Sequence, residues 1–280
     1  MKSKKKTPIK PEKVKWPGGC GRTFFNLLNK EFGHPMKNEE VAADLLCGGI
    51  MMQGHQCGML WGSALAAGAE SFRRNKDKDK AIGLSILTTR KIVESFSSRT
   101  KTVNCRDISQ CDFTSKFELA KYMVKFILFI DRSCFKLADN WAPEVIKAVK
   151  EELSNEKAAV PHPCVSCASI VVEKMGGSDE EQVIVAGFAG GMGLSGNGCG
   201  ALSAAIWLKT LDWCRKHPGK NPSMFNNTDG KKLLDAFNKE TGSELLCRNI
   251  CGKSFNSLEE HSNYINEGGC EKLLNVLAQE

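Results

Sequence analysis

The chain has 280 residues, of which 41% are hydrophobic and 25% are charged, the composition of a folded protein long enough for two domains. Its net charge of +7 does not indicate nucleic-acid binding, because residues 1–15 hold seven lysines against the single acid Glu12 and so supply +6 of it. Residues 1–16 are therefore predicted to be a basic, disordered tail, and we expect no nucleic-acid partner.

The N-terminal charges are not followed by an apolar segment, which predicts that the chain carries no secretory signal. The uncharged stretch 183–208 is long enough to span a bilayer. Its interior, however, holds seven glycines and a polar centre, which predicts a loop between two buried helices. We expect a cytoplasmic protein without membrane insertion.

Apolar residues recur at three- and four-residue spacing along much of the chain, a pattern that predicts helices. In chain order, the clearest segments are 24–32, 39–46, 59–74, 116–130 and 142–153. Asn38 and Asp179 precede acidic pairs as helix N-caps do, and Pro143 fits the first turn of a helix. Segments 171–175 and 183–188 are too short for their period to distinguish helix from strand.

An internal repeat dominates the sequence, since segment 45–60 resembles segment 187–202. Six pairs match at a constant offset of 142: Gly48 with Gly190, Gly49 with Gly191, Gly54 with Gly196, Cys57 with Cys199, Gly58 with Gly200, and Leu60 with Leu202. The same offset relates Cys105 to Cys247, and an arginine follows each of them. We therefore predict an all-α protein built from two tandem, similar helical bundles of about five helices each.

The ends of the repeat align less rigidly. Cys20 pairs with Cys164 at an offset of 144, with Cys167 as the rival partner, and Cys134 pairs with Cys270 at 136. Each copy thus carries four cysteines in one order. The predicted organisation is a tail at 1–16, a first repeat at 17–152, a linker at 153–163 and a second repeat at 164–280.

Thirteen cysteines in a cytoplasmic chain indicate metal ligands or redox thiols rather than structural disulfides. Cys57 and Cys199 each follow a glycine-rich turn and open an apolar helix, whose N-terminus favours the thiolate. The alternative is a buried cysteine in a packed helix corner, but duplication of the whole set favours function. Cys164 and Cys167 form a C-x-x-C motif.

Other candidates receive weaker interpretations. Three cysteines without a partner in the other copy are interpreted as incidental: Cys47, Cys111 and Cys214. Cys251 follows Cys247 by four residues and is interpreted as a spare ligand. The glycine-rich loops fit neither phosphate-binding template, so we predict no nucleotide cofactor.

The order of glycines and cysteines resembles the C-GCAxxG-C-C family of redox-active proteins. The second copy carries GCGALSA, LCRNI and GCEKLL, and the first carries QCGMLWG, NCRDI and SCFKL. Met59 replaces the motif alanine in the first copy, and Ala204 replaces the second motif glycine in the other. The resemblance covers nearly the whole chain as two tandem units, and it implies redox-active cysteines that bind a cluster.

The leading hypothesis is an iron–sulfur protein that transfers electrons to a partner protein, with one cluster per copy or one shared between copies. Candidate ligands are Cys20, Cys57, Cys105, Cys134, Cys164, Cys167, Cys199, Cys247 and Cys270. One alternative is a metal-free thiol–disulfide protein in which Cys164 and Cys167 exchange disulfides. Another is a structural zinc module. An electron carrier and an enzyme both remain compatible with the sequence.

Overall fold

The fold is helical throughout the part of the chain that the computed structural model describes, residues 13–128 and 132–280. These residues form fourteen α-helices and two short 3₁₀ helices and contain no β-strand, which confirms the predicted all-α class. The predicted tail falls outside the described residues except for positions 13–16. There Val14 is buried and Trp16 packs edge-on against Phe135 at 4.7 Å.

The two halves of the chain contain the same elements in the same order, which confirms two tandem, similar repeats. The first repeat contains α1 (Cys20–Phe32), α2 (Lys37–Ala42), η1 (Ala43–Leu46), α3 (Gly58–Arg74), α4 (Lys78–Thr100), α5 (Cys105–Ser109), α6 (Lys116–Ile127) and α7 (Ser133–Leu153). The second contains α8 (Cys167–Lys174), α9 (Asp179–Ile184), η2 (Ala186–Phe188), α10 (Gly200–Lys216), α11 (Thr228–Thr241), α12 (Cys247–Ile250), α13 (Leu258–Asn266) and α14 (Glu271–Gln279). Each described repeat therefore has seven α-helices, two more than predicted.

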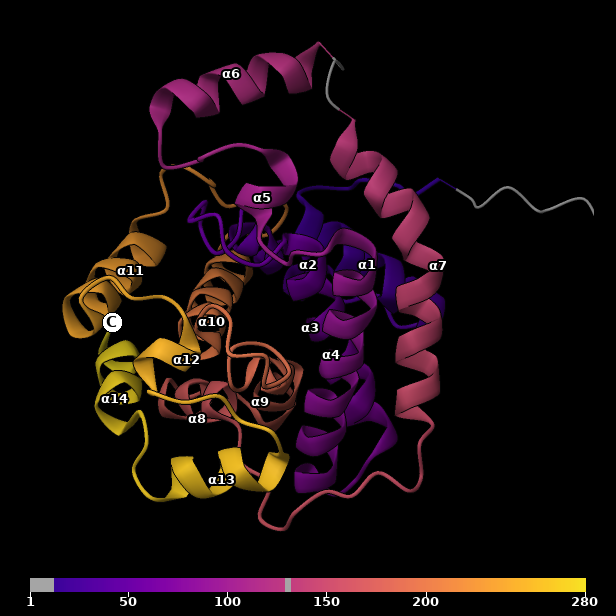
Figure 1. The fold of residues 1–280 in the computed structure, drawn as a ribbon, viewed down its shortest axis with the longest axis vertical. Coiled ribbons are helices and arrows are strands. Elements are labelled where there is room, and N and C mark those ends of the chain that lie inside the picture. The colour runs from indigo at the N-terminus through magenta and orange to yellow at the C-terminus, as the bar shows by residue number, and fades with distance from the viewer. Residues whose placement is uncertain (1–12, 129–131) are drawn as a thin grey trace, which may run out of the picture.

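The two repeats lie side by side, the first indigo to magenta and the second orange to yellow in Figure 1. Their contact is reciprocal, because α3 packs against α9 while its counterpart α10 packs against α2. Trp61 and Phe188 meet edge to face across this contact at 4.6 Å, and Trp207 Nε1 donates a hydrogen bond to the Glu39 carbonyl oxygen at 3.2 Å. One continuous core consequently runs through both repeats.

Two helix starts differ from the sequence prediction by a small shift. Helix α2 begins at Lys37, one residue before the predicted cap Asn38. Helix α9 is capped by Ser178 rather than Asp179, because the Ser178 hydroxyl accepts from the Glu181 N–H while the Glu181 carboxylate accepts from the Ser178 N–H. This reciprocal capping box satisfies two free backbone donors, which a single aspartate at the next position would not do.

The prediction that Pro143 occupies the first turn of a helix is wrong, because the proline lies inside α7. The helix starts earlier and carries Trp141, which is fully buried. Its indole ring stacks on Phe24 at 5.1 Å and meets Phe96 edge-on at 4.8 Å. Burial of this large ring between α1 and α4 offsets the backbone hydrogen bond that proline removes from the helix.

The uncharged stretch 183–208 is divided among the end of α9, η2, a loop and the first half of α10, as the glycine content predicted. Within the described ranges, every helix is too short or too polar to cross a membrane.

Candidate cysteine centres

All eight shared cysteines stand at the N-terminal end of a helix, four in each repeat. In the first repeat, Cys20 and Cys105 begin α1 and α5, Cys57 is the N-cap of α3, and Cys134 is the second residue of α7. In the second repeat, Cys167 and Cys247 begin α8 and α12, while Cys199 and Cys270 are the N-caps of α10 and α14. Helix N-termini carry unpaired N–H groups and a partial positive charge, which oppose the rise in pKa that burial imposes on thiols at these positions.

Identical left-handed loops lead into the second cysteine of each repeat. Five consecutive residues from Gly48 to Met52 have positive φ, and so do the five residues from Gly190 to Leu194. The Gly54 N–H closes the first loop onto the Gly48 carbonyl at 2.8 Å, and the corresponding bond in the second loop measures 2.9 Å. Left-handed conformation costs about 1–2 kcal/mol for each non-glycine residue, so a loop kept in both copies indicates a backbone that the site requires.

A short antiparallel bridge fixes the second and third cysteines of each repeat against one another. The Cys199 N–H donates to the Leu245 carbonyl at 2.8 Å, and the Cys247 N–H donates to the Asn197 carbonyl at 2.7 Å. In the first repeat, Cys57 and Cys105 make the equivalent bonds, at 2.7 and 2.6 Å. The bridging pairs are themselves offset by 142, so the repeat extends to individual backbone contacts.

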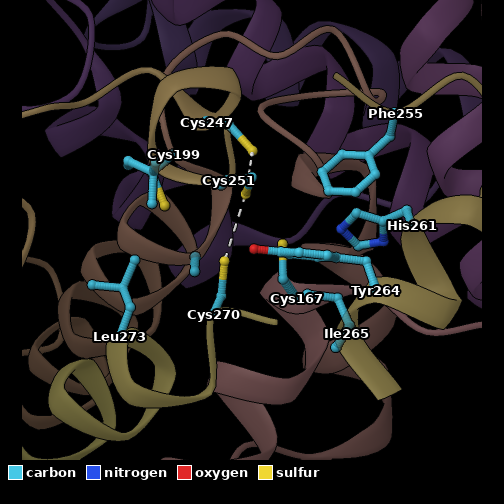
Figure 2. Close-up of a pocket in the computed structure, with 13 residues that line it drawn as sticks. Cys167, Cys199, Cys247, Cys251, Phe255, His261, Tyr264, Ile265, Cys270 and Leu273 are labelled. Carbon is cyan, nitrogen blue, oxygen red and sulfur yellow. Dashed lines mark hydrogen bonds between the residues drawn. The ribbon is translucent and has the colours of Figure 1, made fainter. Parts of the chain in front are cut away.

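The second repeat encloses a cavity of about 20 Å³ lined mainly by sulfur and aromatic side chains. Five thiols face it: Cys167, Cys199, Cys247, Cys251 and Cys270, with Phe255, His261 and Tyr264 along the opposite wall (Figure 2). The Cys251 sulfur lies 3.8 Å from that of Cys247 and 3.6 Å from that of Cys270. This volume holds about one water-sized sphere while the thiols point toward one another.

The first repeat gathers its shared cysteines in the same way. The Cys47 and Cys57 thiols act on Cys20 and lower its pKa, while Cys20 and Cys134 both act on Cys105 and raise its pKa. The motif glycine after Cys57 explains this approach, because a Cβ atom at Gly58 would lie 2.4 Å from the Cys20 sulfur.

One sulfur in each repeat has a pKa lowered by its neighbours. Hydrogen bonds from Cys47 and Cys57 lower the pKa of Cys20, and those from Cys247 and Cys270 lower the pKa of Cys251 to about 3. The donor thiols have raised pKa values in return. Binding of a metal at either site must therefore displace protons from the remaining thiols.

Cys47 and Cys251 are site residues that the sequence interpretation underrated. The Gly21 N–H donates to the Cys47 sulfur at 3.2 Å, which places Cys47 against Cys20 rather than in an incidental position. Neither residue has a counterpart, since position 189 is alanine and position 109 is serine. Comparison of the two copies therefore could not identify Cys47 or Cys251 as site residues. For Cys251 there was one signal, its spacing of four residues from Cys247, which places both on one face of a helix.

Cys164 is not among the thiols that line the cavity, although it is also buried. Cys167 begins α8 as Cys20 begins α1, so the structure makes Cys167, not Cys164, the counterpart of Cys20. The offset of 144 pointed to the wrong cysteine because α8 has eight residues and α1 has thirteen. The start of α8 is therefore displaced by five residues relative to the constant offset of 142. Burial raises the pKa of Cys167 to about 12.

The donor set fits a thiolate-ligated centre, although the present arrangement is not one. Nowhere in residues 13–128 and 132–280 do three or more His, Cys, Asp or Glu side chains have the geometry to hold a metal ion as they stand. Buried sulfur ligands suit zinc and iron–sulfur clusters, and four are available in each repeat.

Asp44, beside the first centre, predicts a pH-dependent stability. Burial raises its pKa to about 6, although the Gly19 N–H donates to it at 2.8 Å and Arg22 lies 3.6 Å away. The folded state therefore holds this proton more tightly than the unfolded chain, whose pKa is about 3.9, so the stabilisation is complete below about pH 3.9 and lost above about 6.

Asp44→Asn cannot ionise and should lack this dependence. Relative to the wild type, the variant is expected to gain up to about 3 kcal/mol between about pH 4 and about pH 7.5. Urea unfolding at both pH values measures the difference, and an equal difference at the two would contradict the prediction.

Comparison with known proteins agrees with the duplication. One family model, described as "Putative redox-active protein (C_GCAxxG_C_C)", matches twice, over residues 19–157 and 162–279. No curated protein and no solved structure matches the chain. Because the two matches cover nearly all of its residues, the chain belongs to the C-GCAxxG-C-C family of redox-active proteins, as two tandem family units.

Proposed function

We propose that each repeat binds one iron–sulfur cluster through its four shared cysteines and that the protein transfers electrons. The ligands would be Cys20, Cys57, Cys105 and Cys134 in the first repeat and Cys167, Cys199, Cys247 and Cys270 in the second. The observation that carries the proposal is the placement of all eight at helix N-termini. Both copies keep this placement although their helices differ in length.

The chain's own residues would stabilise the negative charge of such a centre. Backbone amides act on two of these sulfurs and partly offset the rise in pKa caused by burial, those of Gly190 and Ala168 at Cys167 and those of Leu202 and Ala201 at Cys199. Hydrogen bonds of this kind and the apolar wall around them are among the factors that set cluster potentials. A bound cluster would supply reversible one-electron transfer.

A second candidate function is thiol–disulfide exchange without metal, and the row of three sulfurs in the second repeat favours it. The Cys251 thiolate would attack a disulfide of a partner protein and displace one partner thiolate. Cys270 would then attack the mixed disulfide, leaving Cys251–Cys270 oxidised and the partner reduced. The two sulfurs would have to approach from 3.6 Å to about 2.05 Å. The structure supports this pair better than the C-x-x-C pair of the sequence hypothesis.

Metal analysis distinguishes the candidates. Iron, zinc and acid-labile sulfide would be measured per chain on protein purified without oxygen, together with the visible spectrum. We expect iron and sulfide in matching amounts. Cys57→Ala and Cys199→Ala should each remove about half of both, since each removes a ligand from one repeat only. Cys214→Ala is the matched control, because Cys214 is equally buried but lines neither centre.

The other outcomes have distinct meanings. Zinc without sulfide would establish the structural module instead. A chain that takes up no metal even after anaerobic reconstitution with iron and sulfide would exclude the cluster and leave thiol exchange. If either single variant removed all of the iron, one cluster would be shared between the repeats.

A further inference from the structure

Both tyrosines of the chain occupy equivalent positions beside the two centres. The chain has two tyrosines and fourteen phenylalanines, and Tyr122 and Tyr264 are separated by the repeat offset of 142. Tyr122 lies on α6 and Tyr264 on α13, the helices that precede the fourth cysteine of each repeat. The hydroxyl group that distinguishes tyrosine from phenylalanine is thus used at these two places alone.

In the second repeat, the phenol points at sulfur. Figure 2 shows the Tyr264 oxygen directed into the group of thiols, and Tyr264 lines the same cavity as Cys251 and Cys270. The ring is held by Phe255, with centroids 5.1 Å apart, and by the Lys253 ammonium, 5.0 Å from the ring centroid. This packing fixes the direction in which the hydroxyl donates.

The first repeat has the same arrangement. The Tyr122 hydroxyl is hydrogen-bonded to Cys134. Cys134 is the fourth shared cysteine of the first repeat, and Cys270 is its counterpart in the second. The Tyr122 ring meets Phe113 edge-on at 5.3 Å. Phe113 and Phe255 are also 142 residues apart, so the donor and the ring that supports it were duplicated together.

We propose that Tyr122 and Tyr264 are positioning residues whose phenol O–H groups donate hydrogen bonds to the sulfur ligands of the two centres and raise their reduction potentials. The inference rests on the proposed function. A donor to a ligand sulfur stabilises negative charge, and reduction adds negative charge to the centre. Packing alone would be served equally well by phenylalanine, which occurs fourteen times in the chain.

Tyr264→Phe and Tyr122→Phe remove one oxygen each and leave the ring. Iron and sulfide content would be measured on the anaerobic full-length variants, followed by redox titration in the visible range. We expect unchanged content and, for each variant, a lower potential of its own centre. About a tenfold fall in the equilibrium constant for one-electron reduction corresponds to a lowering of about 59 mV.

Ser262→Ala provides the matched control. It also removes a hydroxyl from α13, but that hydroxyl accepts a hydrogen bond from the Val165 N–H at 3.0 Å and donates to the Val165 carbonyl at 3.5 Å. Both potentials should stay at their wild-type values in this variant.

Three results would overturn the inference. Unmoved potentials in both tyrosine variants with full iron content would show that the phenols do not act on the centres. Loss of iron from a Tyr→Phe variant would make the tyrosine a ligand rather than a donor to one. A wild-type chain without a redox-active centre would overturn the proposed function as well, and this failure is recognised before any variant is made.

Discussion

Gly62→Ala is expected to destabilise the protein by about 3 kcal/mol or more, because the added methyl group has no space. A Cβ atom at Gly62 would lie 1.9 Å from the Gly21 carbonyl oxygen and 2.9 Å from the Phe25 nitrogen. Both contacts are with backbone atoms of α1, which no side-chain rotation can relieve. Helix α3 would have to move away from α1, and Cys20 begins that helix.

The second repeat provides the control for this substitution. Ala204 occupies the position equivalent to Gly62, so α10 accommodates a methyl group where α3 does not. Ala204→Gly should cost only about 1–2 kcal/mol, from the lost buried methyl group and the lower helix propensity of glycine. Urea unfolding and iron content measure both effects. Equal stabilities of the two variants would show that the α1–α3 contact is not as close as the structure has it.

Gly191→Ala is expected to cost about 3 kcal/mol or more and to release the iron of the second repeat. Gly191 has a φ of 76°, and a Cβ atom there would lie 2.5 Å from the Asn197 carbonyl oxygen and 2.9 Å from Cys247 Cβ. About 1 kcal/mol arises from the left-handed conformation and the rest from the clash. Because Cys247 donates to that same Asn197 carbonyl, the substitution displaces a proposed ligand.

Gly242→Ala isolates the conformational part of this cost. Gly242 ends α11 with a φ of 63°, but no atom lies within 4 Å of the place that a Cβ atom would occupy there. We expect a loss of about 1 kcal/mol and a full complement of iron. The prediction for Gly191 is contradicted if the two alanine variants unfold at the same urea concentration.

The duplicated features of the fold and site could be predicted from the sequence because each of them occurs in both repeats. The offset of 142 identified the glycine loops and the cysteines at 57, 199, 105 and 247, and the structure places each pair in matching surroundings. Helical periodicity also identified the all-α class. It missed α4, which is buried on more than one face and lacks a clear polar stripe, and α11, which buries only three of its residues.

Residues present in one copy only could not be predicted from the repeat. Cys47 and Cys251 reach their centres through tertiary contacts that have no periodic signal. The choice between Cys164 and Cys167 depended on the length of α8. A constant sequence offset cannot detect that one helix of a repeat is shorter than its counterpart. The tyrosines carried the offset, but their role became apparent only with the phenol directed at sulfur.

The reciprocal packing of α3 on α9 and of α10 on α2 has the form of a homodimer whose subunits are joined by a covalent linker. In a true homodimer every substitution appears on both sides of the two-fold axis. Fusion removes that constraint and also makes the association independent of concentration. Trp207 bonds the Glu39 backbone across the axis, whereas the matching position in the first half is Leu65. Each half can therefore acquire its own fifth thiol and its own redox character without altering the other.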